Sequence, residues 1–187
     1  MTLANQLTIL RICLVPLLVI LLVYGFYDWG LVVFLVAGIT DALDGLVARL
    51  RQERTELGTL LDPLADKLLV TSSFIVLSLP SPHLAVRIPP WIAILSISRD
   101  AGILLAVLVF NLMVARRSFP PSLLGKMTTL VHIVTIVWVI GCNYGSIQSP
   151  ITDYLLGATV VFVVASGVHY IYVGKWILAR EESQTLE

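Results

Sequence analysis

Residues 41–66 read DALDGLVARLRQERTELGTLLDPLAD and stand between long runs of Leu, Val and Ile. Four aspartates mark this stretch, namely Asp41, Asp44, Asp62 and Asp66. The first two are three residues apart and the last two are four apart, so on helices the carboxylates of each pair share one face. We therefore expect two helices to present two carboxylate pairs at the edge of an apolar bundle.

The composition of the whole chain is typical of a membrane protein. Hydrophobic residues make up 58% of its 187 residues and charged residues only 13%, and its mean hydropathy is +0.94. A helix needs about 20 apolar residues to cross roughly 30 Å of hydrocarbon. The runs of sufficient length lie near 7–27, 30–50, 64–84, 90–114, 122–145 and 151–178. They predict an all-α integral membrane protein with six transmembrane helices and a single domain, residues 1–187.

Basic residues gather at one set of the expected helix ends. They are Arg49, Arg51, Arg54, Arg116, Arg117, Lys126, Lys175 and Arg180, whereas Arg87 alone lies in the opposite loops. By the positive-inside rule, the aspartate stretch and both termini face the cytoplasm. The total of 12 basic and 12 acidic residues provides no net field for nucleic acid, so we expect no such partner.

The two cysteines, Cys13 and Cys142, lie singly in apolar runs. This placement argues against a disulfide framework and a zinc site, and it predicts that both thiols are buried.

The aspartates predict a metal site if the second and third spans pack antiparallel through their short connection. Four converging carboxylates repel one another unless cations neutralise them, and ligation by oxygen alone favours Mg²⁺ or Mn²⁺ over zinc. A pair of such ions typically holds a phosphate or diphosphate. Gly45 and Gly58 leave room for a ligand, and Arg49 offers a charge suited to phosphate oxygens. We thus expect a cytoplasm-facing site for two ions between the second and third helices.

The spacing of these residues resembles the signature of one enzyme family, D-x2-D-G-x2-A-R-x8-G-x3-D-x3-D. All of its fixed positions are present, as Asp41, Asp44, Gly45, Ala48, Arg49, Gly58, Asp62 and Asp66. The chain is thereby similar to the CDP-alcohol phosphatidyltransferases. The opening NQLTILR and the segment DPLADK extend the resemblance.

The resemblance implies a homodimeric enzyme, placed in the bacterial cytoplasmic membrane, that moves a phosphatidyl group from CDP-diacylglycerol to an alcohol and releases CMP. It implies that Asp41, Asp44 and Asp62 bind Mg²⁺ or Mn²⁺, and that Asp66 is the catalytic base and also touches the second ion. It further assigns four positions to the CDP pocket, namely Gly45, Ala48, Arg49 and Gly58.

The acceptor alcohol must be read from other residues. Cationic side chains at Arg99, Arg116, Arg117 and Lys126 could bind an anionic acceptor, either glycerol 3-phosphate or phosphatidylglycerol. In the alternative reading, Arg99 and Asp100 pair with other helices for packing, and Arg116 and Arg117 lie at the anionic lipid surface. NQLTILR and DPLADKLLV resemble bacterial phosphatidylglycerophosphate synthases, whereas SRD and SLLGKMTT resemble CMP-releasing cardiolipin synthases. Both acceptors stay open, with glycerol 3-phosphate favoured.

Two other classes of membrane protein fit less well. Intramembrane prenyltransferases also use aspartate pairs with Mg²⁺, but they lack the G-x2-A-R and G-x3-D elements. A non-enzymatic transporter would spread polar residues through the middle of the membrane, whereas these acids gather near one face. The transporter remains a remote alternative.

Overall fold

A computed structural model of the chain describes the backbone of residues 3–51, 56–113 and 123–184, and the side chains of residues 9–40, 67–106 and 123–172. These parts form six α-helices, which confirms the all-α prediction and the number of helices for the described residues. The helices are α1 (Leu3–Val23), α2 (Tyr27–Arg51), α3 (Glu56–Ser78), α4 (Pro90–Met113), α5 (Leu123–Gly145) and α6 (Ile151–Gln184).

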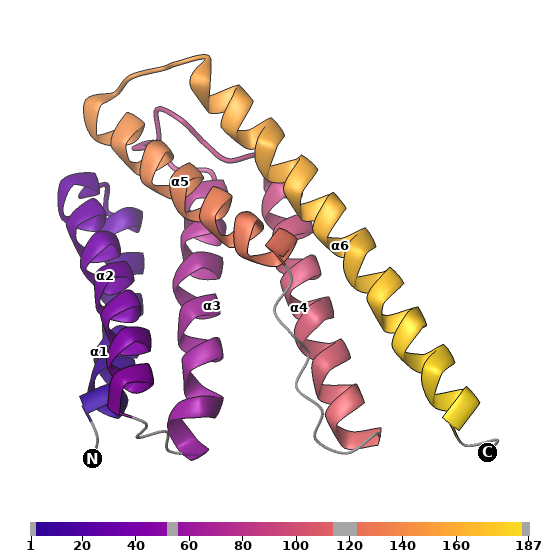
Figure 1. The fold of residues 1–187 in the computed structure, drawn as a ribbon. Helices are drawn as coiled ribbons and strands as arrows, with labels where there is room; N and C mark the ends of the chain where they lie inside the picture. Colours follow the sequence, from indigo (N-terminus) through magenta and orange to yellow (C-terminus); the bar gives the residue numbers. More distant parts are fainter. Residues whose placement is uncertain (1–2, 52–55, 114–122, 185–187) are drawn as a thin grey trace.

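The helices form a bundle in which the chain runs up and down between two ends (Figure 1). The start of α1, the end of α2 and the start of α3 lie at one end, together with the ends of α4 and α6. We call this the motif end. Among the residues that the structure describes, helix α1 packs extensively on both α2 and α3, while α2 and α3 make few contacts with each other. Over these residues α1 therefore makes more contacts with α2 and α3 than those two helices make with each other, and the expected packing of the two signature segments against each other stays a prediction.

Several helix boundaries differ from the predicted spans, and the largest differences are in α3 and α1 among the first five helices. Helix α3 was expected over 64–84 but covers Glu56–Ser78, because its polar first turns are helical and the prolines after Ser78 belong to a non-helical segment. Helix α1 was expected to reach residue 27 but ends at Val23. Gly25 makes the turn into α2 with a φ of +81°, and a Cβ there would lie 3.1 Å from Cβ of His83. A positive φ and a close neighbour both favour glycine at this position.

The distribution of polar and apolar side chains is that of a membrane protein. Large apolar side chains face outward, including Ile94, Leu105 and Val161 with 64%, 61% and 65% of their surface exposed. Hydroxyl groups instead join helices inside the bundle, where Oγ1 of Thr135 on α5 lies 3.0 Å from Oγ1 of Thr159 on α6. Such interhelical hydrogen bonds are common where the surrounding solvent is lipid.

Helix lengths agree with this distribution. Within the described residues, α5 and the segment Ile151–Tyr172 of α6 are each long and apolar enough to cross a membrane, with a mean hydropathy of 1.8. These lengths agree with a helical bundle embedded in a membrane.

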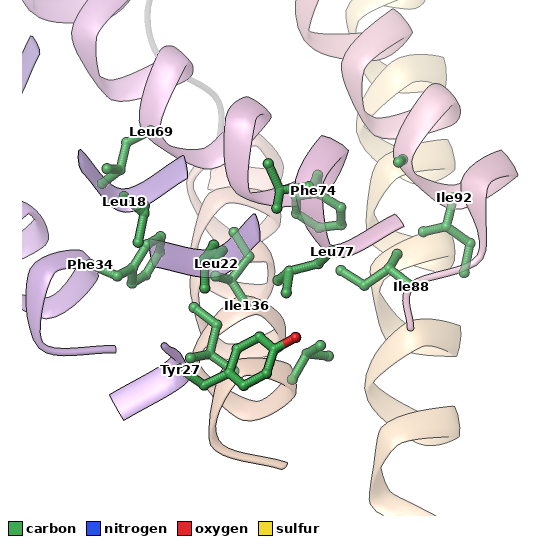
Figure 2. Close-up of a cluster of buried hydrophobic side chains, with 14 of the residues drawn as sticks. Leu18, Leu22, Tyr27, Phe34, Leu69, Phe74, Leu77, Ile88, Ile92 and Ile136 are labelled. Atoms are coloured by element: carbon green, nitrogen blue, oxygen red, sulfur yellow. The ribbon is translucent and has the colours of Figure 1, made fainter. Parts of the chain in front are cut away.

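The main apolar core contains residues of all six helices, and most of them come from α1, α2, α3 and α5 (Figure 2). Leu18 of α1 lies in one cluster with Phe34 of α2, Leu69 of α3 and Ile136 of α5. All four side chains have at most 5% of their surface exposed. This core holds α1 against the two helices that carry the aspartates.

Away from the motif end, an asparagine clamps the connection between α3 and α4. The backbone N–H of Val86 donates to Oδ1 of Asn143 at 2.9 Å, and Nδ2 of Asn143 donates to the carbonyls of Val86 and Val139, each at 2.8 Å. Asn143 itself is 4% exposed. The clamp fixes this connection to α5.

The two cysteines have different environments. Cys142 is buried, as predicted, but the expectation for Cys13 is wrong because its side chain is exposed on α1. In a membrane protein the outer surface is itself apolar, so an apolar run does not identify the buried face.

Candidate functional site

The signature residues occupy two helix ends. Asp41, Asp44, Gly45, Ala48 and Arg49 belong to the last turns of α2, and Gly58, Asp62 and Asp66 belong to the first turns of α3. Helix α2 ends at Arg51 and α3 begins at Glu56, so both segments lie at the motif end (Figure 1). Their side chains are outside the described residues. The convergence of the four carboxylates and the CDP pocket therefore stay predictions.

The chemistry of this donor set fits a hard divalent cation. Four aspartates offer only carboxylate oxygens, which are the ligands that Mg²⁺ and Mn²⁺ prefer. Among the residues whose side chains the structure describes, no group of three or more His, Cys, Asp or Glu could hold a metal ion. The motif end is thus the place in the chain where a divalent metal would be sought.

Arg11 is a residue to which the sequence assigned no role. Its side chain is fully buried on α1, at 0% exposure. Arg11 precedes Leu18 by seven positions, or about 10 Å along a helix at ~1.5 Å per residue. Helix α2 runs antiparallel to α1, so seven positions from Phe34 towards the motif end lead to position 41. Helix α3 runs parallel to α1, so seven positions from Leu69 towards the motif end lead to position 62. Arg11 therefore lies at the level of two signature aspartates.

A buried arginine in an apolar helix is costly, and such residues usually have a function. This signal could have drawn attention to Arg11 in the sequence. The sequence alone does not show which face of α1 turns inward, so it does not predict that Arg11 is buried.

Arg99, a candidate for binding the acceptor, lies in a buried ion cluster. Its Nη1 is 2.6 Å from Oδ1 of Asp100, and its Nη2 donates to Oγ of Ser166 on α6. The guanidinium also lies 5.8 Å from the ring centre of Tyr170. Only 7% of the Arg99 side chain is exposed. These contacts favour the alternative reading in which Arg99 and Asp100 pair with other helices.

The second cation of this cluster is Lys67, another residue that the sequence did not single out. Its Nζ lies 2.6 Å from Oδ2 of Asp100, so the single carboxylate bridges α3 and α4. Lys67 directly follows Asp66, and 31% of its side chain is exposed. The pairing could not be read from the sequence because 33 positions separate the two residues.

The remaining candidates for acceptor binding are not joined to this cluster by any contact that the structure describes. Lys126 is exposed in the first turns of α5. Arg116 and Arg117 lie outside the described residues. Their roles toward the acceptor stay predictions.

Comparison with known proteins gives the chain its relatives. A family model described as CDP-alcohol phosphatidyltransferase matches residues 1–166, which include the whole signature. A probable phosphatidylglycerophosphate synthase of Mycobacterium tuberculosis is 34% identical over 181 residues, covering 90% of this chain and 79% of that protein. A CDP-diacylglycerol–glycerol-3-phosphate 3-phosphatidyltransferase of Bacillus subtilis is 32% identical over 188 residues, covering 90% of this chain and 92% of that protein.

A CMP-forming cardiolipin synthase of Homo sapiens is also similar, at 31% identity over 169 residues. This match covers 82% of the chain and 52% of the human protein. The family match extends over most of the chain and agrees with the membrane fold and with the position of the signature at two neighbouring helix ends. The chain therefore belongs to the CDP-alcohol phosphatidyltransferase family of membrane-embedded enzymes.

Proposed function

We propose that this enzyme transfers the phosphatidyl group of CDP-diacylglycerol to glycerol 3-phosphate, forming phosphatidylglycerophosphate and CMP. The observation that carries the choice of acceptor is the similarity to the two bacterial proteins named for this reaction, each covering 90% of the chain. The cationic residues near the motif end suit an anionic acceptor, and both glycerol 3-phosphate and phosphatidylglycerol are anions.

In the proposed reaction, the acceptor hydroxyl oxygen forms a bond to the phosphorus that carries diacylglycerol. The bond from that phosphorus to the bridging diphosphate oxygen breaks, and the electron pair leaves with CMP. Asp66 accepts the proton of the hydroxyl group. Residues 41–66 contain no Ser, Cys or His, so we favour direct displacement over a covalent phosphatidyl-enzyme.

Asp41, Asp44, Asp62 and Asp66 would hold two Mg²⁺ or Mn²⁺ ions. When bound, such ions neutralise diphosphate charge and stabilise the departing phosphate oxygen. Gly45, Ala48, Arg49 and Gly58 would line the pocket for CDP. The buried guanidinium of Arg11, on the helix that packs against both α2 and α3, adds fixed positive charge inside the bundle.

We also propose that all six helices cross the membrane as one domain of residues 1–187. The basic residues at the motif end support a cytoplasmic position for the site, with the protein in the bacterial cytoplasmic membrane. A homodimer is proposed from the family resemblance.

Phosphatidylglycerol is the second candidate acceptor, which would make the enzyme a cardiolipin synthase. The similarity to the human cardiolipin synthase favours it, as does the SRD sequence at Arg99–Asp100. This alternative keeps the same donor, site and leaving group. It differs only in the alcohol that attacks.

The experiment that separates the two acceptors measures product formation by purified protein with CDP-diacylglycerol and Mg²⁺ or Mn²⁺. Glycerol 3-phosphate and phosphatidylglycerol are supplied in separate reactions, and lipid products are identified by mass spectrometry. Phosphatidylglycerophosphate as the dominant product supports the proposal. Turnover with phosphatidylglycerol alone would refute the choice of acceptor and leave the family reaction intact.

A further inference from the structure

The ion cluster beside the motif end consists of Lys67, Arg99, Asp100 and Ser166, which we call the Asp100 cluster. It joins three helices, because Lys67 lies on α3, Arg99 and Asp100 on α4, and Ser166 on α6. Each oxygen of Asp100 pairs with a different cation at 2.6 Å. Ser166 is fully buried, and 10% of the Asp100 side chain is exposed. The cluster is a tightly packed connection rather than a surface ion pair.

Helix packing alone does not require charges at this place. Ionisable side chains inside a membrane protein are expensive to bury, and α5 and α6 are joined by the uncharged Thr135–Thr159 pair. Removing all the charges in the cluster would still leave apolar surfaces to pack. A charged connection at this level therefore suggests a function beyond cohesion.

The position of Lys67 indicates what that function is. Lys67 directly follows Asp66, so a bond that fixes its amino group also fixes the rotation of α3 at the proposed base. A helix turns by about 100° per residue, and a small rotation would displace the neighbouring carboxylate. Asp100, the partner of Lys67, is also held in place by Arg99. Arg99 forms an ion pair with Asp100 and donates a hydrogen bond to Ser166 on α6.

We propose that Asp100 is a positioning residue, which holds Asp66 in its productive orientation through Lys67. Arg99 and Ser166 brace Asp100 against α6. Neither Arg99 nor Asp100 is open enough to serve as the main contact for a substrate, because at most 10% of either side chain is exposed. The inference rests on the proposed function, in which Asp66 accepts the proton of the acceptor.

The test compares steady-state kinetics of CMP release by the full-length protein in detergent, with CDP-diacylglycerol and glycerol 3-phosphate. Asp100→Asn should lower kcat roughly 10- to 100-fold, since a displacement of about 1 Å in a catalytic group can cost this much. The KM for glycerol 3-phosphate should change by less than about threefold, because no group that touches this substrate is replaced. Asp100→Glu should recover part of kcat. Asp153→Asn, at an exposed acid in the first turn of α6, is the matched control and should leave kcat unchanged.

A second variant guards against misfolding of Asp100→Asn, which leaves two cations without their shared carboxylate. Lys67→Met removes one cation and leaves Arg99 and Asp100 as a neutral pair, so it should fold and show a similar loss of kcat. If Asp100 acts through Lys67, the double variant with both Asp100→Asn and Lys67→Met should have a kcat within about threefold of that of Lys67→Met alone. Losses that multiply would show independent roles and overturn the proposal.

Two other results would also overturn it. One is a kcat of Lys67→Met within about threefold of wild type. The other is a raised KM for glycerol 3-phosphate with unchanged kcat, which would make Lys67 an acceptor-binding residue. If the wild-type protein uses only phosphatidylglycerol, the choice of acceptor fails, and the same comparison with that acceptor still decides the positioning role.

Discussion

Replacing Asn143 by alanine should destabilise the protein without impairing its chemistry. The side chain makes three hydrogen bonds, two with the backbone of Val86 and one with the carbonyl of Val139, at 2.8–2.9 Å. At about 1 kcal/mol each, their loss would cost roughly 3 kcal/mol. For a chain of this length that corresponds to a fall in Tm of about 6–12 °C. The clamp lies away from the motif end, so kcat at low temperature should stay unchanged.

The buried thiol next to this residue provides the assay. In a Cys13→Ser background, Cys142 is the one remaining thiol, and a thiol-reactive fluorescent dye would label it as the protein unfolds on heating. Gln148→Ala is the matched control, because it removes an exposed amide close to the same end of α5. A Tm shift below about 2 °C for Asn143→Ala, equivalent to less than ~1 kcal/mol, would refute the structural role of the clamp.

Three further predictions concern the motif end. Asp66→Asn should lower the rate of transfer by about 10²- to 10⁴-fold while CDP-diacylglycerol binding persists, because it removes a general base; a rate close to wild type would exclude that role. Asp41→Asn should raise the Mg²⁺ or Mn²⁺ concentration for half-maximal activity, and chelation of the wild-type protein should abolish turnover until either ion is restored. Activity that survives chelation would contradict the metal site. Arg11→Gln should destabilise the protein by about 3–5 kcal/mol, because the groups that interact with this fully buried guanidinium would lose its charge. Arg11→Lys should retain more stability and activity; equal Tm values for the two variants would count against a charge-dependent role.

Much of the helical architecture could be predicted because membrane spans have a strong local signal. A run of about 20 apolar residues is visible in any sequence window, and it located all six helices. The beginning of α3 was missed because Glu56 and its neighbours are polar, although they continue the helix. The end of α1 was missed because it depends on the positive φ of Gly25 in a turn that packs against His83.

The sequence predicted the site only through the signature, whose residues stand at fixed spacing. The signature placed the aspartates on the two helices that end and begin at the motif end, because both halves are local patterns. The pairing of Lys67 with Asp100 and the inward position of Arg11 depend on how distant helices pack, which hydropathy does not encode. Burial of Cys13 was predicted wrongly for the same reason.

The central claim is that the enzyme transfers a phosphatidyl group directly to glycerol 3-phosphate. The measurement that tests it most directly is the amount of CMP and of phosphatidylglycerophosphate formed from CDP-diacylglycerol, with and without that acceptor. We expect equal amounts of the two products in its presence and no CMP in its absence. CMP released at a comparable rate without any acceptor would contradict the claim, because it would show hydrolysis or a covalent intermediate instead of direct transfer.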